Sequence, residues 1–147
     1  MAVDVVSEIV INAPPQRVAA YAGDPSNAPE WYVNIKQVEW LTPPPVTVGS
    51  RMNFVAQFLG RRLAYTYEVV DHRPGERLVM RTAQGPFPME TTYTWEPHGA
   101  GATRMTLRNR GEPSGFASVG APVMAAAMRR ANAKDLAALK RLIEAAP

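Results

Sequence analysis

Histidine, carboxylate and amide side chains are the groups of this chain that could carry acid–base or metal chemistry. The two histidines, His72 and His98, each stand beside a predicted turn, in DHRPGE and EPHGAG. A histidine beside a turn is usually exposed to solvent, and two such separated residues do not make a zinc site. Cysteine is absent, which excludes disulfides, thiolate metal sites and cysteine nucleophiles. Neither a phosphate-binding glycine loop nor a Gly-x-Ser-x-Gly motif occurs, so the sequence predicts no cofactor and no metal site.

Asp135 and Asn132 are the polar residues with unusual positions. At helical spacing Asn132 falls inside an apolar stripe, between Met128 and Leu139, and Asp135 falls at its edge. A buried polar side chain without a hydrogen bond costs about 1–3 kcal/mol, so each needs a partner. In one interpretation both orient a polar group of a ligand, and Asp135 is the weak candidate for a catalytic residue. In the other, which the general rule favours, Asn132 bonds a tyrosine and Asp135 pairs with an arginine.

Aromatic and sulfur-containing side chains form a second candidate set. They alternate along the predicted strands, with more on the C-terminal helix, and methionine and tyrosine suit an adaptable pocket of a few hundred cubic ångströms. On the pattern alone, ordinary core packing is the simpler interpretation. The candidate ligand-binding residues are Trp31, Phe54, Tyr65, Tyr67, Met80, Phe87, Met89, Tyr93, Met105, Asn109, Phe116, Met124, Met128 and Asn132.

The elements that must position these residues follow from hydrophobic periodicity and turn signals. Alternation of period two predicts an antiparallel sheet with one buried and one wet face. Two short helices are predicted at Gln16–Ala22 and Asn27–Trp31, and one long helix from Pro122 to Ala145, which needs a large apolar surface to cover it. The fold class is therefore α+β. The predicted strands are Val3–Ile11, Lys36–Leu41, Arg51–Leu59, Arg62–Val70, Arg77–Thr82, Phe87–Trp95 and Thr103–Arg110.

Length and charge limit the number of domains, the kinds of partner and the localisation that we expect. The 147 residues fit a single domain, 1–147. The net charge is +3, but the arginines are dispersed and no basic run exceeds two residues, so we expect no nucleic-acid partner. The first residues lack the positive charge of a signal peptide, and no apolar segment approaches the roughly 20 residues of a membrane span. We therefore expect a cytoplasmic protein without stable membrane insertion.

The chain resembles the START-like helix-grip superfamily, and most closely its polyketide cyclase/dehydrase and lipid-transport families, often labelled SRPBCC. The similarity lies in IVINAPPQRVAAYAGDPSNAPEW, VGSRM, YEVVDHRPGERLVMRT and TTYTWEPHGAGATRM. It implies a curved seven-stranded antiparallel sheet wrapped around a long C-terminal helix, with two short helices between the first two strands. It also implies an internal cavity for an apolar ligand, which makes a pocket the better interpretation of the inward side chains. These motifs are turns and core positions, so they specify the fold better than the function.

Two segments could control access to such a cavity. Trp31 ends the second short helix, and we place it at the cavity mouth in contact with the ligand, whereas Trp40 packs on the sheet. Phe116 lies in RNRGEPSGFASVGAP, before the long helix, which is either a gate or an ordinary loop.

Three functions stay open at this point. The first is a binding module for a small hydrophobic or amphipathic ligand of the lipid, isoprenoid or aromatic polyketide type. The second is a polyketide cyclase or dehydratase, in which a tyrosine or Asn132 polarises a carbonyl and Asp135 accepts a proton. The third is a protein-interaction module with a filled core, which would use the arginine-rich outer face of the last helix. The sequence leaves open whether the chain is a monomer or a homodimer.

Overall fold

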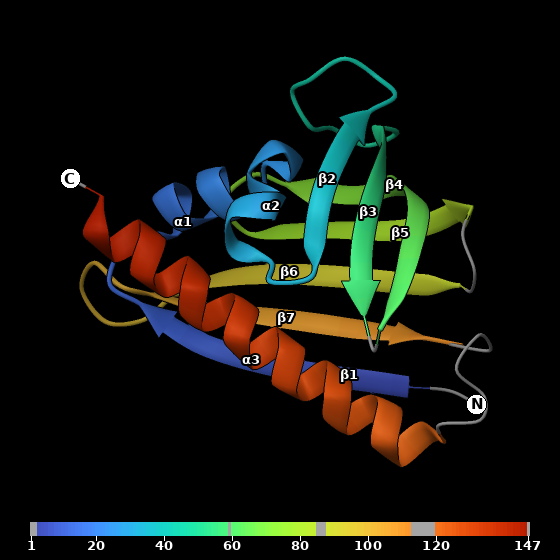
Figure 1. The fold of residues 1–147 in the computed structure, drawn as a ribbon. Helices are drawn as coiled ribbons and strands as arrows, with labels where there is room; N and C mark the ends of the chain where they lie inside the picture. Colours follow the sequence, from blue (N-terminus) through green and yellow to red (C-terminus); the bar gives the residue numbers. More distant parts are fainter. Residues whose placement is uncertain (1–2, 59, 85–87, 113–119, 147) are drawn as a thin grey trace.

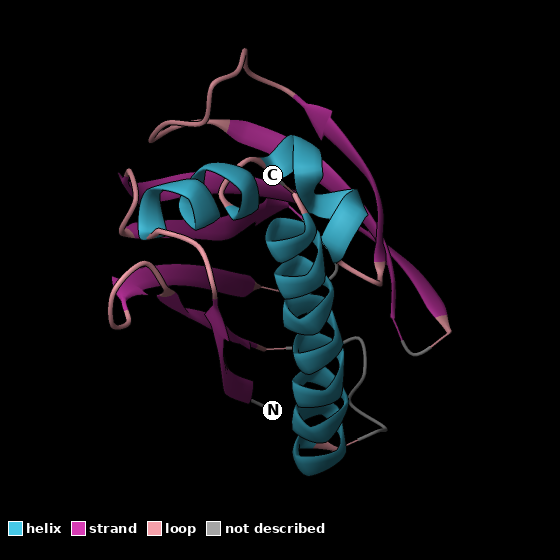
Figure 2. Ribbon diagram, turned by 90° about the vertical axis from the view of Figure 1, so that its left-hand side faces the viewer, coloured by secondary structure: helices cyan, strands magenta, loops and turns pink. Residues whose placement is uncertain are grey.

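A seven-stranded antiparallel sheet curves around the helices (Figures 1 and 2). The computed structural model describes residues 3–58, 60–84, 88–112 and 120–146. This architecture is the α+β helix-grip arrangement that the sequence predicts, with both short helices between the first two strands. The elements are β1 (Val3–Ile11), α1 (Pro15–Ala22), a 3₁₀ turn η1 (Pro25–Asn27), α2 (Ala28–Trp31), β2 (Ile35–Trp40), β3 (Arg51–Phe58), β4 (Arg61–Arg73), β5 (Arg77–Gln84), β6 (Met89–Pro97), β7 (Thr103–Gly111) and α3 (Ala121–Ala145).

The strand order is β1-β7-β6-β5-β4-β3-β2, so the first two strands in sequence form the two edges of the sheet. The register shifts between Ile35 and Gln37, between Thr66 and Tyr67, and between Val69 and Asp71. Irregularities of this kind bend the strand in which they occur and increase its twist. One lies in β2, and the other two lie along the β4–β5 pair, where the extra residues are Val70 of β4 and Ala83 of β5.

Turn chemistry fixes the short helices at one end of the sheet. Pro15 occupies the first turn of α1, where its missing N–H is not needed, and the N–H of Gly23 closes the helix on Ala19 O at 2.8 Å. Asp24 then caps η1 by accepting a hydrogen bond from the backbone N–H of Ser26. The second helix, predicted from residue 27 to 31, is α2 at Ala28–Trp31, and the 3₁₀ turn η1 precedes it and includes Asn27.

The long helix α3 has 25 residues, or about 37 Å at 1.5 Å per residue. Its buried side chains recur every three or four positions and form one stripe that faces the concave side of the sheet. Leu142, which the sequence pattern also places on this side, is 40% exposed. The stripe consists of Met124, Met128, Asn132, Asp135, Leu136, Leu139 and Ile143.

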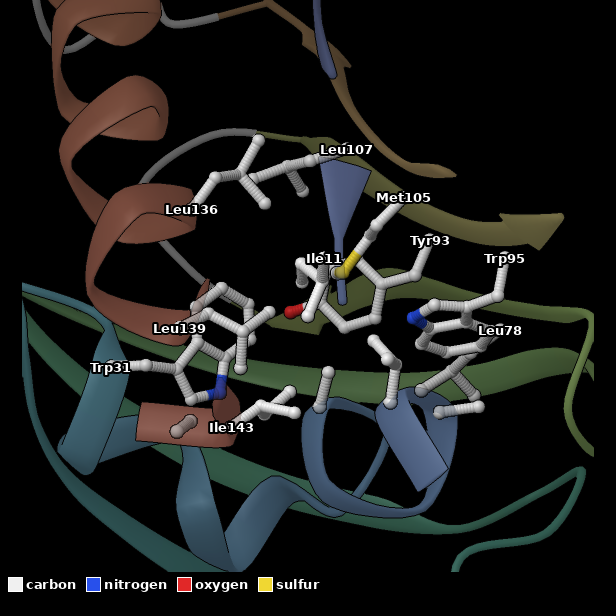
Figure 3. Packing of buried hydrophobic residues seen from close by; sticks show 14 of the residues in the cluster. Ile11, Trp31, Leu78, Tyr93, Trp95, Met105, Leu107, Leu136, Leu139 and Ile143 are labelled. Carbon is white, nitrogen blue, oxygen red and sulfur yellow. The ribbon is translucent and has the colours of Figure 1, made fainter. Parts of the chain in front are cut away.

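The main hydrophobic core fills the end of the fold where α1 and α2 meet the second half of α3 (Figure 3). Leu136, Leu139 and Ile143 approach side chains from β6 and β7, with Trp31 and Ile11 beside them. A smaller cluster lies toward the other end of α3 and includes Met124 and Met128. The buried polar residues of the helix, Asn132 and Asp135, lie at its centre, between these two clusters.

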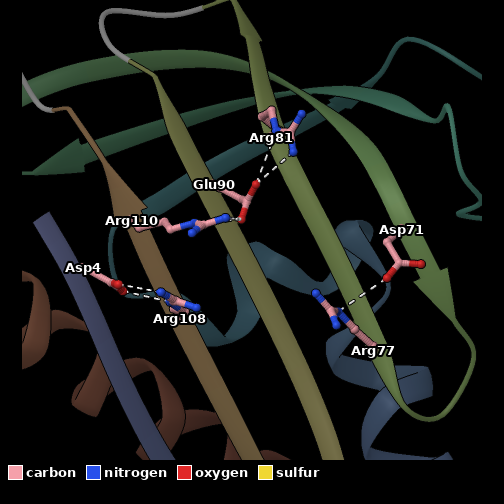
Figure 4. A network of polar contacts seen from close by, with 7 residues as sticks. All are labelled: Asp4, Asp71, Arg77, Arg81, Glu90, Arg108 and Arg110. Carbon is pink, nitrogen blue, oxygen red and sulfur yellow. Dashed lines mark hydrogen bonds and ion pairs between the residues drawn. The ribbon is translucent and has the colours of Figure 1, made fainter. Parts of the chain in front are cut away.

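Charged side chains cover the outer face of the sheet (Figure 4). Arg81 and Arg110 lie on either side of Glu90, with N–O distances of 3.1 and 2.7 Å. Arg108 pairs with Asp4 across the β1–β7 junction. The arginines of these pairs are exposed to solvent, and exposed ion pairs contribute little stability.

Arg17 of α1 attaches the end of α3 to the rest of the fold. Its Nη2 donates hydrogen bonds to Ile143 O at 2.9 Å and to Ala146 O at 2.7 Å. The last carbonyls of a helix have no partner within the helix and carry partial negative charge, so a guanidinium group is a suitable donor there. On the same turn, Lys140 donates to Val10 O of β1 and to Glu144.

The substitution Arg17→Ala removes both hydrogen bonds from the last turn of α3. We expect a loss of about 1–2 kcal/mol in the free energy of unfolding, equivalent to a decrease of about 3–6 °C in Tm. Arg130→Ala is the control, because Arg130 is exposed on α3 and no hydrogen bond or ion pair joins it to the described residues. Thermal unfolding followed by circular dichroism tests this, and equal Tm values for the two variants would contradict the role of Arg17.

Candidate functional site

A pocket of about 160 Å³ lies between the first half of α3 and strands β3 to β7. We call it the central pocket. It is smaller than the few hundred cubic ångströms expected from the sequence, although an apolar cavity of about 150 Å³ accommodates a benzene ring. Four of its residues are methionines, whose side chains change shape readily. The lining residues are Tyr32, Asn34, Ile35, Phe54, Ala56, Leu63, Tyr65, Tyr67, Met80, Met89, Thr91, Tyr93, Asn109, Met124, Met128, Ala131, Asn132 and Asp135.

Most of the candidate residues named from the sequence meet at this pocket. Met105 is instead fully buried in the main core. Phe87 and Phe116 lie outside the described residues. The candidates that line the pocket are Phe54, Tyr65, Tyr67, Met80, Met89, Tyr93, Asn109, Met124, Met128 and Asn132, together with Asp135.

Trp31 lies in the core and does not line the central pocket. It is only 1% exposed, and its ring is 4.1 Å from that of Tyr32 and 5.9 Å from that of Tyr93, measured between centroids (Figure 3). The next residue, Tyr32, lines the pocket in its place. Trp31 therefore supports the tyrosine that faces the pocket.

Several lining residues were not on the sequence-derived list. Ala56, Leu63 and Thr91 share a strand face with predicted neighbours two positions away, so period-two alternation could have included them. Ala131 adjoins Asn132 on α3. The connection from α2 to β2, which follows no regular period, contributes Tyr32 and Asn34, and Ile35 at the start of β2 also lines the pocket.

A chain of hydrogen bonds connects the wall of the sheet to α3. The Thr91 hydroxyl donates to Asn109 Oδ1 at 2.8 Å, and Asn109 Nδ2 donates to Asn132 Oδ1 at 3.2 Å. The partner of Asn132 is thus an asparagine of β7 and not a tyrosine. Asn132 Nδ2 is buried and has no hydrogen-bond partner among the described residues. The chain therefore ends in a donor that a ligand oxygen or a water molecule could satisfy.

Asp135 lies one turn further along α3 and is 2% exposed. Its Oδ1 accepts a hydrogen bond from the backbone N–H of Val33 at 2.8 Å, so its partner is the α2–β2 connection and not an arginine. Burial raises the pKa of Asp135 from its ordinary value of 3.8 to about 6, although the Val33 N–H partly offsets this rise. The group is therefore half ionised near pH 6 and mostly ionised at pH 7, so it can accept a proton at neutral pH.

Tyrosine hydroxyls complete the polar part of the pocket. The hydroxyls of Tyr32 and Tyr93 are hydrogen-bonded to each other. Burial raises the pKa of both phenols well above the ordinary value, and the charge of Asp135 raises each further. Burial likewise raises the pKa of Tyr67 to about 12. These hydroxyls are therefore protonated at neutral pH and serve as hydrogen-bond donors.

The described residues contain no cluster of three histidine, aspartate or glutamate side chains suited to a metal ion. His98 is exposed in the turn after β6, and His72 is half-buried away from the central pocket. In the described part of the chain, no helix is long and apolar enough to cross a membrane.

The chain belongs to the polyketide cyclase / dehydrase and lipid transport family, whose sequence description matches residues 2–144. No curated protein gives a significant sequence match. Among solved structures it is similar to TTHA0849 from Thermus thermophilus, with a TM-score of 0.82 and 22% identity over 97% of this chain and 98% of the other. It is also similar to the Zhui aromatase/cyclase from Streptomyces sp. R1128, with a TM-score of 0.79 and 16% identity over 98% and 94%. A START superfamily protein from Mycobacterium smegmatis gives a TM-score of 0.82 and 17% identity over 96% of this chain and 97% of the other. At these identities the structural comparisons establish the fold.

The substitution Asp135→Asn should change the dependence of stability on pH. Because the pKa of Asp135 is raised in the folded state, its protonation stabilises the fold fully below pH 3.8, and this stabilisation is lost as the pH rises through about 6. Asparagine resembles the protonated acid and keeps an oxygen for the Val33 N–H. We expect the variant to be more stable than the parent protein by about 3 kcal/mol at pH 8 and by less than about 1 kcal/mol at pH 4. Thermal unfolding at both pH values tests this, and a difference that does not vary with pH would contradict it.

Proposed function

We propose that this protein binds a small, mostly apolar molecule in the central pocket and holds one oxygen atom of that molecule at Asn132. The observation that carries the proposal is the buried Asn132 Nδ2, which lacks a partner in the described part of the chain and lies in the wall of an otherwise largely apolar pocket. Leaving such a donor unsatisfied costs about 1–3 kcal/mol, so an accepting oxygen is stabilising there.

The hydrogen-bond chain fixes the direction in which Asn132 can act. Asn109 uses its oxygen for Thr91 and its amide N–H for Asn132 Oδ1, which leaves the Asn132 amide nitrogen turned to other acceptors. A ligand carbonyl or hydroxyl oxygen fits this donor, while the methionines contact its apolar part. Lipid, isoprenoid and aromatic polyketide molecules all have this chemistry, and the family description names both polyketide chemistry and lipid transport.

The size of the central pocket limits what it admits without rearrangement. About 160 Å³ is enough for one ring or a short branched chain. A larger ligand requires the side chains of Met80, Met89, Met124 and Met128 to move, which methionine permits at low strain. A completely filled core, the condition of a pure interaction module, agrees less well with this space.

Filling the pocket should abolish binding while preserving the fold. Ala131 lines the pocket on α3, so Ala131→Phe places a ring inside it, whereas Ala126→Phe places the same ring on the exposed side of the helix. Calorimetry with acetophenone and with ethylbenzene, which lacks the oxygen, measures the effect. We expect both the parent protein and Ala126→Phe to prefer acetophenone by about tenfold, equivalent to one hydrogen bond of about 1.4 kcal/mol.

Two results would contradict the binding proposal. In the first, Ala131→Phe, folded by circular dichroism, binds acetophenone as tightly as Ala126→Phe does. In the second, Asn132→Leu keeps the preference for acetophenone over ethylbenzene. Native mass spectrometry of the protein as purified from cells adds an independent measurement, because a retained small molecule would identify the physiological ligand directly.

Asp135 favours a second candidate function, a cyclase or dehydratase in the same pocket. Its carboxylate could take a proton from a carbon between two carbonyl groups, which leaves an enolate whose oxygen is stabilised by Asn132 or a tyrosine hydroxyl. The enolate carbon would then attack a second carbonyl carbon of the same chain, and the resulting alkoxide would take a proton. The raised pKa of Asp135 and its burial beside Tyr32 and Tyr93 support this chemistry.

Turnover of a poly-β-ketone mimic should therefore depend on Asp135. We expect Asp135→Asn to lower kcat at least a hundredfold, because general-base catalysis contributes about 10²–10⁴-fold, while binding changes little. Product formation followed by liquid chromatography measures the rate, and calorimetry measures the binding. Unchanged turnover in the variant would remove Asp135 from the mechanism, and no turnover in the parent protein would leave ligand binding as the function.

A further inference from the structure

A second and larger depression lies on the far side of the main core from the central pocket. We call it the α1 groove. It has a volume of about 660 Å³ and is bordered by residues of α1, η1, the end of β2, the β2–β3 connection, the β4–β5 turn and β6. No described residue lines both this groove and the central pocket. Its volume lies within the range of about 300–1,000 Å³ that is usual for small-molecule sites.

Trp40, Ser26 and Asp24 form a connected unit on one wall of the α1 groove. The indole Nε1–H of Trp40 donates to Ser26 Oγ at 2.8 Å, and the backbone N–H of Ser26 donates to Asp24 Oδ1 at 3.0 Å. These bonds hold an aromatic ring and a carboxylate in a fixed relative position. Trp40 and Asp24 are both half-buried and both line the groove, so their free surfaces face the same space.

The other walls of the α1 groove are mostly apolar, although Gln16 and His72 also line it. Pro44, Pro45 and Val46 contribute one wall from the β2–β3 connection, whose ends are held by hydrogen bonds from Leu41 N to Arg51 O and from Gly49 N to Val69 O. The floor is closely packed, because a Cβ on Gly23 would lie 2.6 Å from Ala19 O and 3.3 Å from Trp95. Walls held in this way favour a groove that is already formed before a ligand binds, which lowers the cost of binding.

The charge of the α1 groove has one sign. Among the described residues that line it, Asp24 is the one with a formal charge when histidine is neutral. Asp24 Oδ1 has a hydrogen bond from Ser26, while Asp24 Oδ2 has no hydrogen bond or ion pair within the described residues. Because the chain as a whole carries a net charge of +3, a groove with only a negative charge runs against the average of its surface. A cation is thus the ligand that this wall complements.

We propose that the α1 groove is a second binding site, and that it takes a small organic amine with an aromatic or alicyclic body. The ammonium group lies between the Asp24 carboxylate and the face of Trp40, where ion pairing and a cation–π interaction act together. The apolar body contacts the proline wall and Trp95. This site is independent of the central pocket, so it stands or fails separately from the proposed function.

The three tryptophans of the chain make the proposal directly measurable. Trp40 and Trp95 line the α1 groove, whereas Trp31 lies in the core beside the central pocket. In ¹H–¹⁵N spectra each indole N–H gives its own signal. We expect 2-phenylethylammonium to shift the Trp40 signal saturably and to leave that of Trp31 in place. The neutral isostere 2-phenylethanol and the anion 3-phenylpropanoate should bind at least ten times more weakly.

Variants separate charge recognition from structural damage. Asp24→Asn keeps an oxygen for the Ser26 N–H and should lower the affinity for 2-phenylethylammonium about tenfold. Glu8→Gln removes one negative charge from β1, outside the groove, and should leave the affinity unchanged. Trp40→Leu should abolish binding, with folding checked by the Trp31 signal. The proposal is overturned if the Trp40 signal does not move, if Asp24→Asn binds as tightly as Glu8→Gln, or if the amine shifts residues of the central pocket instead.

Discussion

The organisation of this protein depends on how the polar residues of one buried helix stripe are satisfied. Asn132 and Asp135 interrupt an apolar stripe that the curved sheet encloses, and burial in such surroundings is unfavourable without partners. Asn109 of β7 satisfies one oxygen of Asn132, and the Val33 N–H satisfies one oxygen of Asp135. Both residues line the central pocket. The same contacts thus hold α3 against the sheet and give the pocket its chemistry.

The two hydrophobic clusters pack against different parts of α3. The main core, around Leu139 and Ile143, packs the second half of the helix against α1, α2 and the sheet. The smaller cluster, with Met124 and Met128, surrounds the region where space is left open. Leucine and isoleucine have few rotamers and give a rigid core, whereas methionine adapts to its surroundings. On α3 itself, the side chains that face the main core are leucine and isoleucine, and those that face the smaller cluster are methionine.

Regular periodicity was enough to predict most of the fold. The bounds of β1 are as predicted, and α3 begins one residue earlier than expected, because alternation and the apolar stripe are strong local signals. β4 continues to Arg73, beyond the predicted end at Val70, since a register shift breaks the alternation there. The partner of Asp135 lies 102 residues away, a contact that no local pattern encodes. The size of an aromatic ring does not show which way it points. The sequence therefore could not tell that Trp31 lies in the core and that the adjacent Tyr32 lines the pocket.

The attachment of α3 has a mechanical consequence. Arg17 and Lys140 hold its last turns by hydrogen bonds from charged groups, and Asn132 and Asp135 hold its centre, while its first turns, around Met124 and Met128, pack through apolar side chains. Apolar contacts have no preferred direction and re-form after a small displacement, whereas charged hydrogen bonds require their geometry. Any tilt of the helix away from the sheet therefore hinges about its carboxyl-terminal end, and the gap that results widens over the methionines.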